Sequence, residues 1–337
     1  MSRLKYYLRV LSGTSFKKLG TAINKSHEKS GKNKVFIFFD MIVCAVFYGA
    51  GYNDYLIFAF WDMKRFQRRT YLTRLINKRL VTTVNDSRFR YIFDRKDEFN
   101  KRFGEYLHRE FIYLPDAGYE KFCEFFERMG KVIIKPRVGE SGKGIELLYF
   151  EDNRDSLKEL YDRLMNNNLT VIEEVVVQHP KMAELYPDGV NTLRVVTFVH
   201  EGKAELVYAV CKMGNGGRFV DNMESGGLCC PIDVSTGKIC GIAHSSALIN
   251  YEKHPQTGVE LIGFEIPFVN EAIELCLKAA MEIPEFRYLG WDAAITKDGP
   301  LLFEGNDYPG YDFWQLPEHT PDKIGLRPYF AQRVPGI

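Results

Sequence analysis

Residues 290–306 read G-W-D-A-A-I-T-K-D-G-P-L-L-F-E-G-N, and this stretch decides the fold that the sequence predicts. Two apolar runs flank the turn sequence T-K-D-G, which is typical of a β-hairpin in which Gly299 takes a left-handed conformation. If K-D-G forms a three-residue loop, counting outward along both strands places Asp292 opposite Glu304. The stretch therefore predicts an antiparallel hairpin that carries two facing carboxylates.

The polar residues of this hairpin form a candidate metal site. Side chains alternate between the two faces of a strand, so Glu304 and Asn306 project on the same side, next to Asp292. Two carboxylates do not gather easily without a counter-ion, and no cation lies beside them in the sequence. Oxygen ligands of this kind suit Mg²⁺, with Mn²⁺ as the alternative metal. The competing interpretation is a solvated edge hairpin, but the apolar neighbours Trp291 and Phe303 favour a buried setting.

The composition is typical of a globular cytoplasmic enzyme. The chain has 337 residues, 45% of them hydrophobic and 26% charged, which is enough for two or three domains. A net charge of +1 excludes the charge balance of a nucleic-acid-binding protein. Seven cysteines show no metal-ligand spacing, and the adjacent pair Cys229 and Cys230 is expected to be structural. No apolar segment follows the N-terminal bases closely enough to form a signal peptide.

The N-terminal region combines a basic segment with an apolar one. Residues 1–34 hold nine Lys or Arg against one acid, Glu28, and Leu4, Tyr7, Leu8 and Leu11 recur at helical spacing. Such a helix could lie on an anionic membrane surface or dock on the protein's own body. The apolar segment from Val35 to Gly51 is interrupted by Asp40 and is too short to span a bilayer, so a buried helix is expected. Peripheral contact of residues 1–34 with the inner membrane face is a further hypothesis.

The chain is expected to be an α+β protein in three parts. Residues 1–95 are predicted to be mainly helical, residues 96–170 to carry a glycine loop between two strands, and residues 171–337 to carry mainly strands, including the hairpin. Outside the N-terminal region, the expected elements are an apolar helical stripe at Phe122, Phe125, Phe126 and Met129, helices at 156–166 and 269–281, and strands at 131–136, 145–150, 170–178, 193–200 and 204–213.

The glycine loop V-G-E-S-G-K-G does not match a P-loop. Arg137 stands where the first glycine should be, Gly144 replaces the Ser or Thr that binds metal, and a strand follows instead of a helix. A glycine-rich turn between strands can instead act as a flap whose N–H groups close over phosphate oxygens. The alternative is a flexible hairpin tip. Lys135 favours the flap, because it ends the strand V-I-I beside the loop, where it can bind phosphate.

The order of these residues resembles the ATP-grasp superfamily, and most closely its sugar-transfer-associated branch, which is similar to glutamate-ligase homologues. The resemblance covers residues 94–316 and runs from Lys135 through the flap, E-E-V-V-V, Arg194 and Lys212 to Asp292 and E-x-N. Its specific motifs are V-N-T-L-R-V-V-T, M-G-N-G-G-R-F-V-D-N and H-P-Q-T-G-V-E. It implies two α+β subdomains that clamp ATP, the flap subdomain being residues 96–170 and the metal and substrate subdomain residues 171–337.

The resemblance also implies roles for individual residues. Lys135 would contact the phosphates, Glu174 and the backbone of Val175 and Val176 would line the adenine pocket, and Gln178 would reach the ribose. Arg194 and Lys212 would approach the phosphates and an acyl phosphate, with Asn306 as a further catalytic residue. The implied ATP-binding residues are Lys96, Lys135, Ser141, Gly142, Glu174, Val175, Val176 and Gln178, and the implied metal ligands are Asp292, Glu304 and Asn306.

The chemistry implied is ligation of a carboxylate to an amine through an acyl phosphate, in surface polysaccharide biosynthesis. Substrates would be a small-molecule carboxylate and an amine, either of them linked to a sugar. Asn222, Gly226 and Gly227 could bind a substrate carboxylate, and Asp221 an incoming ammonium. Two alternatives stay open: a kinase that phosphorylates a sugar hydroxyl, and a non-catalytic nucleotide-binding partner of glycan assembly. The oligomeric state is not predicted.

Overall fold

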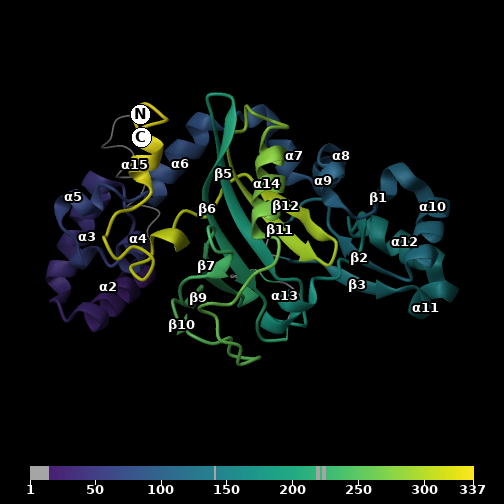
Figure 1. Cartoon of the computed structure of the whole chain (residues 1–337), viewed down its shortest axis with the longest axis horizontal. Helices are drawn as coiled ribbons and strands as arrows, with labels where there is room; N and C mark the ends of the chain where they lie inside the picture. The colour runs from purple at the N-terminus through teal and green to yellow at the C-terminus, as the bar shows by residue number, and fades with distance from the viewer. Residues whose placement is uncertain (1–14, 140–141, 218–220, 222–224) are drawn as a thin grey trace. The chain divides into compact units, whose positions relative to one another are not determined.

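The computed structural model describes residues 15–139, 142–217, 221 and 225–337, in two compact units (Figure 1). The first unit joins the residues up to Val84 with Gly310–Ile337, and the second holds Asn85–Pro309. The expected boundaries lay at residues 95 and 170, which placed the C-terminal segment with the hairpin. In the structure this segment, Gly310–Ile337, groups with the N-terminal helices. One cause is Gln315, whose side chain accepts from Leu72 N and donates to Leu72 O at 2.8 and 2.9 Å.

The first unit is helical, as expected, around an aromatic core. Tyr55, Phe58, Phe60 and Tyr71 are fully buried, with ring centroids 5.0–6.5 Å apart. The helices of this unit are α2 (Phe16–Ser30), α3 (Lys34–Tyr48), α4 (Tyr52–Ile57), α5 (Arg65–Arg68), α6 (Arg74–Val84) and α15 (Arg327–Ala331), with the 3₁₀ helices η1 (Phe60–Asp62) and η5 (Phe313–Gln315).

Helix α3 corrects one expectation. The apolar segment was expected to be a buried helix, and it is helical from the Asn33 cap to Gly49, where φ is 64°. It buries only one face, formed by Ile37, Met41, Cys44 and Tyr48. The opposite face carries large apolar side chains that are exposed, because no other described element of this unit is packed over them. Among the described residues, no helix combines the length and hydropathy that crossing a bilayer requires.

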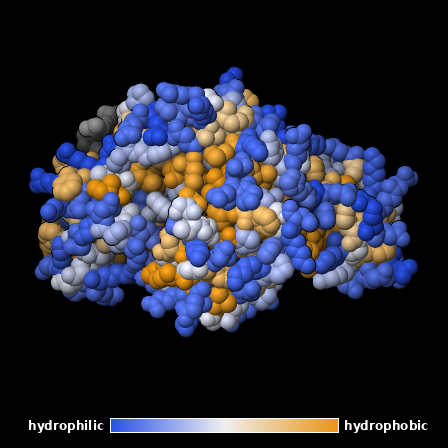
Figure 2. All heavy atoms as spheres, viewed as in Figure 1, coloured by the Kyte–Doolittle hydropathy of each residue, from blue (hydrophilic) through white to orange (hydrophobic). Residues whose placement is uncertain are grey.

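The second unit contains a four-stranded antiparallel sheet that carries the flap. The strand order is β1-β4-β2-β3, built from β1 (Phe111–Tyr113), β4 (Val171–Glu174), β2 (Lys131–Lys135) and β3 (Glu146–Tyr149). Helices α10 (Leu114–Met129) and α12 (Leu157–Asn166) pack on it, and α11 (Phe150–Asn153) and η3 (Arg154–Ser156) connect β3 to α12. The predicted apolar stripe of α10 is confirmed, since Phe122, Phe125 and Phe126 are buried. Figure 2 shows mainly hydrophilic residues on the visible surface of these helices.

The larger sheet has eight strands, all antiparallel to their neighbours. Its order is β10-β9-β7-β6-β5-β11-β12, with β8 paired to β7. The strands are β5 (Thr192–His200), β6 (Lys203–Met213), β7 (Leu228–Asp233), β8 (Lys238–Ile239), β9 (Ala243–Ser245), β10 (Asn250–Tyr251), β11 (Tyr288–Thr296) and β12 (Gly299–Asn306). The helices of this part are η2 (Ser87–Phe89), α7 (Arg90–Asp94), α8 (Lys96–Arg102), α9 (Gly104–Leu107), α13 (Pro180–Leu185) and α14 (Val269–Ala280). Cys229 and Cys230 are buried in β7, as expected of structural residues.

The hairpin β11–β12 has the predicted facing pair but not the predicted loop. Thr296 pairs with Gly299, so the loop holds two residues and not three. A β-bulge then adds Phe303 as an extra residue on β12, because Ala293 pairs with Leu302 and Asp292 with Glu304. The shorter loop and the bulge cancel, which is why the count from the sequence still reached the correct pair.

Gly305, between the two predicted metal ligands of β12, allows the aromatic core to approach the strand. A Cβ atom there would lie 2.9 Å from carbon atoms of both Phe93 and Phe99. We expect Gly305→Ala to lower the free energy of unfolding by about 1–3 kcal/mol, because rings in a packed core must move. Urea denaturation checks this, with Gly104→Ala as the matched control, since a Cβ on Gly104 meets no atom within 4 Å. Equal stability of both variants would contradict the packing argument.

Candidate functional site

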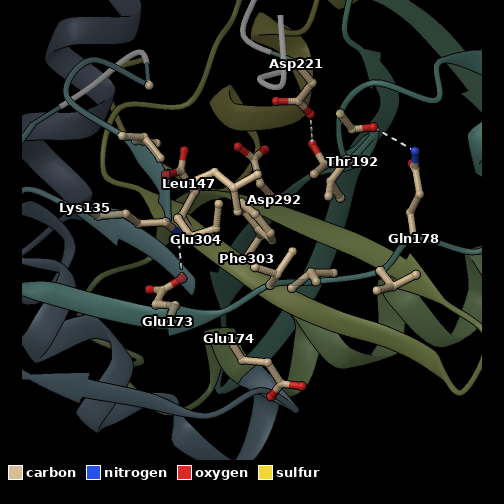
Figure 3. A pocket seen from close by; sticks show the side chains of 18 of the residues that line it. Lys135, Leu147, Glu173, Glu174, Gln178, Thr192, Asp221, Asp292, Phe303 and Glu304 are labelled. Carbon is tan, nitrogen blue, oxygen red and sulfur yellow. Dashed lines mark hydrogen bonds and ion pairs between the residues drawn. The ribbon is translucent and has the colours of Figure 1, made fainter. Parts of the chain in front are cut away.

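A cavity of about 500 Å³ lies between the four-stranded sheet and the hairpin β11–β12 (Figure 3). This volume is within the range of small-molecule sites. The sequence-predicted residues that line it come from both sides, and they are Lys96, Lys135, Gly142, Glu174, Val175, Val176, Gln178, Lys212, Asp221, Asp292 and Glu304. Residues that are more than a hundred positions apart in the chain therefore meet at one site, as the ATP-grasp resemblance implied.

Lys135 enters the cavity at the end of β2 and is held by a buried carboxylate. Its Nζ donates to Glu173 Oε2 at 2.6 Å, and the same carboxylate accepts from Arg109 Nε at 3.1 Å and from Asn100 Nδ2 at 2.8 Å. Burial raises the pKa of Glu173, but the charges of Arg109 and Lys135 and the bond from Asn100 lower it more, so its pKa lies well below the usual range. These contacts hold the Lys135 ammonium in place. Its Nζ also lies 4.8 Å from the centre of the Phe303 ring.

Arg109 joins the two sides of the cavity. Besides Glu173, it donates through Nη1 to Leu302 O at 2.5 Å and through Nη2 to Phe303 O at 3.1 Å. These two carbonyls belong to the bulge of β12. One guanidinium thus binds strand β4 and the bulged strand of the hairpin, which fixes Lys135 relative to Glu304.

The segment after β4 is extended but leaves the sheet early. A strand was predicted over 170–178, whereas β4 ends at Glu174. The Glu174 side chain accepts from Glu110 N at 3.0 Å and points away from the Lys135–Asp292 cluster (Figure 3). Among the described residues, the backbone N–H and C=O groups of Val175 and Val176 form no hydrogen bond. Both residues line the cavity, so these polar groups are available to a ligand.

On the opposite side of the cavity, Asp292 is surrounded by cations. Arg194 donates to both of its oxygens, Nε to Oδ1 at 2.5 Å and Nη2 to Oδ2 at 3.0 Å, and Lys212 Nζ lies 3.0 Å from Oδ2. Burial raises the pKa of Asp292, but Arg194 and Lys212 lower it more, so the net direction is downward. Lys212 also pairs with Asp221 Oδ1 at 3.3 Å, and Thr192 donates to Asp221 Oδ2.

These cations correct part of the sequence argument for the metal. No cation lies beside the carboxylates in the sequence of the hairpin, but strand β5 places Arg194 directly opposite Asp292, and β6 supplies Lys212. Burial alone would raise the pKa of Asp292, and the ion pairs with Arg194 and Lys212 offset that cost. The counter-ions of Asp292 are thus protein side chains.

Glu304 is the carboxylate that fits a metal ion. No described residue gives its side chain a hydrogen bond or an ion pair. The Glu304 side chain is exposed to the open cavity, but the surrounding protein atoms partly desolvate its carboxylate, and this desolvation followed by the charge of Asp292 raises its pKa. Asn306 donates Nδ2 to Gly290 O at 3.3 Å, which leaves its Oδ1 as the possible ligand atom. The register puts Asp292, Glu304 and Asn306 on one face. Among the described residues, no group of three or more His, Cys, Asp or Glu could hold a metal, so Asn306 is needed to complete the predicted set.

The glycine loop is anchored at its base by two contacts. Lys96 Nζ donates to Gly139 O at 2.7 Å, and Arg137 forms two hydrogen bonds to Asp97 at 2.8 and 2.9 Å. Gly142 lines the cavity and has a φ of 71°. The strands on both sides pair as predicted, β2 with β3. Lys96 therefore positions the loop in this structure, in addition to facing the cavity.

The remaining predicted site residues have other positions. Gln178 lines the cavity, but its amide is used within the protein: Nε2 donates to Tyr186 O and Gly189 O, and Oε1 accepts from Asn191. Arg194 binds Asp292 but does not itself line the cavity. Asn306, Gly226 and Gly227 do not line the cavity. Ser141 and Asn222, like the N-terminal residues Leu4, Tyr7, Leu8 and Leu11, lie outside the described residues.

Several lining or supporting residues were missed from the sequence. Arg109 and Asn100 carried no motif, and Glu173 was read only as part of E-E-V-V-V. Alternation along the strand was the available signal, because Glu173 and Glu174 must point to opposite faces and only one of them can face Lys135. The other lining residues that were not predicted are Lys131, Ile133, Pro136, Gly139, Lys143, Ile145, Leu147, Val177, Ala183, Pro187, Asp188, Gly189, Val190, Thr192 and Phe303.

Comparison with known proteins gives a family match and a set of similar solved structures. The family model described as sugar-transfer associated ATP-grasp matches residues 75–327. No curated protein matches the sequence.

Similar solved structures include D-alanyl-alanine synthetase A from Vibrio cholerae, with 14% identity, a TM-score of 0.40 and coverage of 71% of this chain and 60% of that chain. The ATP-grasp ligase PsnB with a minimal precursor has 14% identity, a TM-score of 0.43 and coverage of 80% and 73%. The D-cycloserine synthetase DcsG has 11% identity, a TM-score of 0.43 and coverage of 77% of both chains. This chain thus spans only 60% of the length of the Vibrio synthetase.

The Glu173 network gives a pH-dependent prediction. We expect Glu173→Gln to lower the free energy of unfolding by about 3–5 kcal/mol at neutral pH, because two buried cations lose their carboxylate. The lowered pKa makes this stabilisation full above the unfolded value of about 4.3, and it is lost as the pH falls towards the lower folded value. Urea denaturation should therefore show that the difference in the free energy of unfolding between wild type and Glu173→Gln becomes smaller as the pH falls from about 5 to about 3.

The matched control is Glu110→Gln. Glu110 forms an ion pair with Arg128, but both side chains are more than half exposed. Loss of this ion pair should therefore lower the free energy of unfolding by less than about 1 kcal/mol. If the difference in the free energy of unfolding between wild type and Glu173→Gln is the same at every pH, the assigned ion pairs are wrong.

Proposed function

The chain belongs to the sugar-transfer associated ATP-grasp family, and we propose that it is an ATP- and Mg²⁺-dependent ligase that joins a carboxylate to an amine through an acyl phosphate. One observation carries this proposal. Lys135 on one side and the Lys212–Asp292–Glu304 cluster on the other face the same cavity of about 500 Å³. A phosphate-binding cation and a metal-binding carboxylate are the two groups that phosphoryl transfer from a nucleotide needs.

The adenine would lie against the extended segment after β4. The unpaired backbone groups of Val175 and Val176 offer a donor and an acceptor to the edge of a base, and Ile133, Leu147 and Val177 line the cavity with apolar surface. Burying polar backbone groups without a partner is costly, so a base that bonds to them gains affinity. This arrangement supports a nucleotide in the cavity more than it supports an unspecific apolar ligand.

The phosphates would point from this segment towards Lys135 and the flap. Arg109 and Lys135 carry two positive charges against the single charge of Glu173, so this side has a surplus cation. Phosphate oxygens would take the donors of Lys135 that Glu173 leaves free, and the glycine N–H groups at Gly142 would close over them.

Mg²⁺ would be held by Glu304, Asp292 and Asn306. Bound there, it neutralises charge that accumulates on the β- and γ-phosphates. Arg194 and Lys212 keep Asp292 ionised and oriented, since their charges lower its pKa. Lys212 also lies where a transferring phosphoryl group would develop charge, between Asp221 and Asp292.

The reaction has two steps that balance. An oxygen of the substrate carboxylate attacks the γ-phosphorus, the bond to the β–γ bridging oxygen breaks, and ADP leaves. The amine nitrogen then attacks the carbonyl carbon of the acyl phosphate, phosphate leaves, and the amine loses a proton to phosphate or solvent. The protein supplies positioning and fixed charges, and a closed flap excludes water that would hydrolyse the intermediate. No nucleophilic side chain is required.

Asp221 supports an amine as the second substrate. Its carboxylate lines the cavity beside Lys212 and is oriented by Thr192, so an ammonium group could bind to it before reaction. The family name supports a sugar-linked acid or amine of surface polysaccharide biosynthesis as the substrate class. Gly226 and Gly227, together with Asn222, are the proposed contacts to the substrate carboxylate.

Two substitutions test the assigned sides of the cavity. We expect Lys135→Ala and Glu304→Ala each to abolish ATP turnover, because the first removes the phosphate contact and the second removes the metal ligand. The fold should survive, since Glu173 keeps Arg109 and Asn100, and Glu304 has no partner among the described residues. Coupled ADP release is the measurement, and Lys203→Ala at the exposed β5–β6 turn is the control. Activity within about tenfold of wild type (~1.4 kcal/mol) in either variant would contradict its role.

The acyl phosphate is tested with isotopically labelled acid. A panel of amino acids and uronic acids is screened for amine-dependent ADP release and for products by mass spectrometry. With an ¹⁸O-labelled carboxylate, the proposed route transfers one ¹⁸O atom to the released phosphate, because that oxygen bridges carbon and phosphorus in the intermediate. ADP release with a phosphorylated sugar and no free phosphate would instead identify a kinase.

A further inference from the structure

Helix α3 exposes an apolar face that the proposed reaction does not use. The side chains on this face are large and well exposed, and they are Val35, Phe36, Phe38, Phe39, Ile42, Val43, Val46 and Phe47. Phe39 is 60% exposed and Phe47 73%, values that are unusual for phenylalanine in a helix of a folded unit. A contiguous exposed apolar surface of this kind marks an interaction site.

The face is continuous along the whole helix. At about 100° per residue, these eight positions cover roughly half of the circumference, and the buried residues Ile37, Met41, Cys44 and Tyr48 occupy the opposite side. Asp40 is the only charged residue within the helix after Lys34, and it is turned to the edge, where Arg68 binds both of its oxygens and Tyr55 donates to Oδ2. The exposed face therefore contains no charge.

Basic residues flank this apolar face. Helix α2, which packs on α3, exposes Lys17, Lys18, Lys25 and Lys29, and its only acid is Glu28. At the start of α3, Lys34 is exposed and Lys32 lies 5.5 Å from the centre of the Phe36 ring. An apolar face with ammonium groups at its N-terminal end and on the neighbouring helix is complementary to the acyl chains and the anionic headgroups of a membrane surface.

We propose that α3 docks the protein on an anionic lipid bilayer, lying in the interface with its exposed face among the acyl chains. The helix has 15 residues, about 22 Å in length, which is shorter than the ~30 Å of a hydrocarbon core, so it lies along the surface and does not cross. The lysines of α2 bind lipid phosphates at the same time. The earlier expectation placed membrane contact in residues 1–34, and this proposal moves the apolar contact to α3.

Vesicle co-sedimentation of the full chain tests the docking. Phosphatidylcholine–phosphatidylglycerol vesicles and pure phosphatidylcholine vesicles are compared without nucleotide, so the result is independent of the proposed ligase activity. We expect the wild-type protein to sediment with the anionic vesicles, more weakly with the neutral ones, and less at high salt. The double variant Phe39→Ser/Phe47→Ser should lower the partition coefficient about tenfold or more, because two anchoring rings are lost.

The variant side chains are exposed, so the thermal unfolding midpoint of the double variant should equal that of wild type. The matched control is Phe66→Ser, which removes an equally exposed ring (59%) from α5 of the same unit and should bind vesicles as wild type does. Equal sedimentation of wild type and double variant overturns the proposal. So does a wild-type dimer that the double variant converts to a monomer while neither binds vesicles, because the face would then belong to a second copy.

Discussion

A fully buried carboxylate, Glu173, is the constraint around which the site is built. A buried charge is tolerated only with partners, and Glu173 takes them from three places in the chain: Asn100, Arg109 and Lys135. Two of these partners also help to form the cavity. Lys135 presents its ammonium to it, and Arg109 extends to the carbonyls of the hairpin bulge. The ion pairs that neutralise the buried charge of Glu173 therefore also fix Lys135 relative to the hairpin β11–β12.

The bulge in β12 gives this arrangement its second anchor. Strand β12 lies at the edge of the sheet, so in a regular ladder one of two successive carbonyls would point to β11 and the other away from it. The extra residue at Phe303 disrupts the ladder, and Arg109 binds the carbonyls of both Leu302 and Phe303. The Phe303 ring then lies against both cations, 4.8 Å from Lys135 Nζ and 5.1 Å from Arg109 Cζ.

The sequence was informative wherever local periodicity and turn chemistry were sufficient. They predicted the hairpin, the flap strands and the facing pair of Asp292 and Glu304, and the ATP-grasp resemblance brought Lys135 and Lys212 to the same site. Long-range pairing was not accessible in this way. Arg194 reaches Asp292 only because β5 and β11 are neighbours, and Arg109 reaches Glu173 from outside any motif. The apolar composition of α3 could not show which face would stay exposed, since burial depends on the elements that surround a helix.

The two sides of the cavity carry opposite imbalances of charge. Around Glu173, two cations oppose one carboxylate, and around Asp292, the two cations Arg194 and Lys212 oppose Asp221, Asp292 and Glu304. One side therefore has a surplus cation and the other a surplus carboxylate. The pKa of Glu304 is raised by desolvation in the cavity and by the charge of Asp292. A nucleotide whose phosphates approach Lys135 and whose divalent metal approaches Glu304 would satisfy both imbalances at once. Neither a neutral ligand nor an anion without a metal would do so, and this supports a metal-bound nucleotide as the ligand of the cavity.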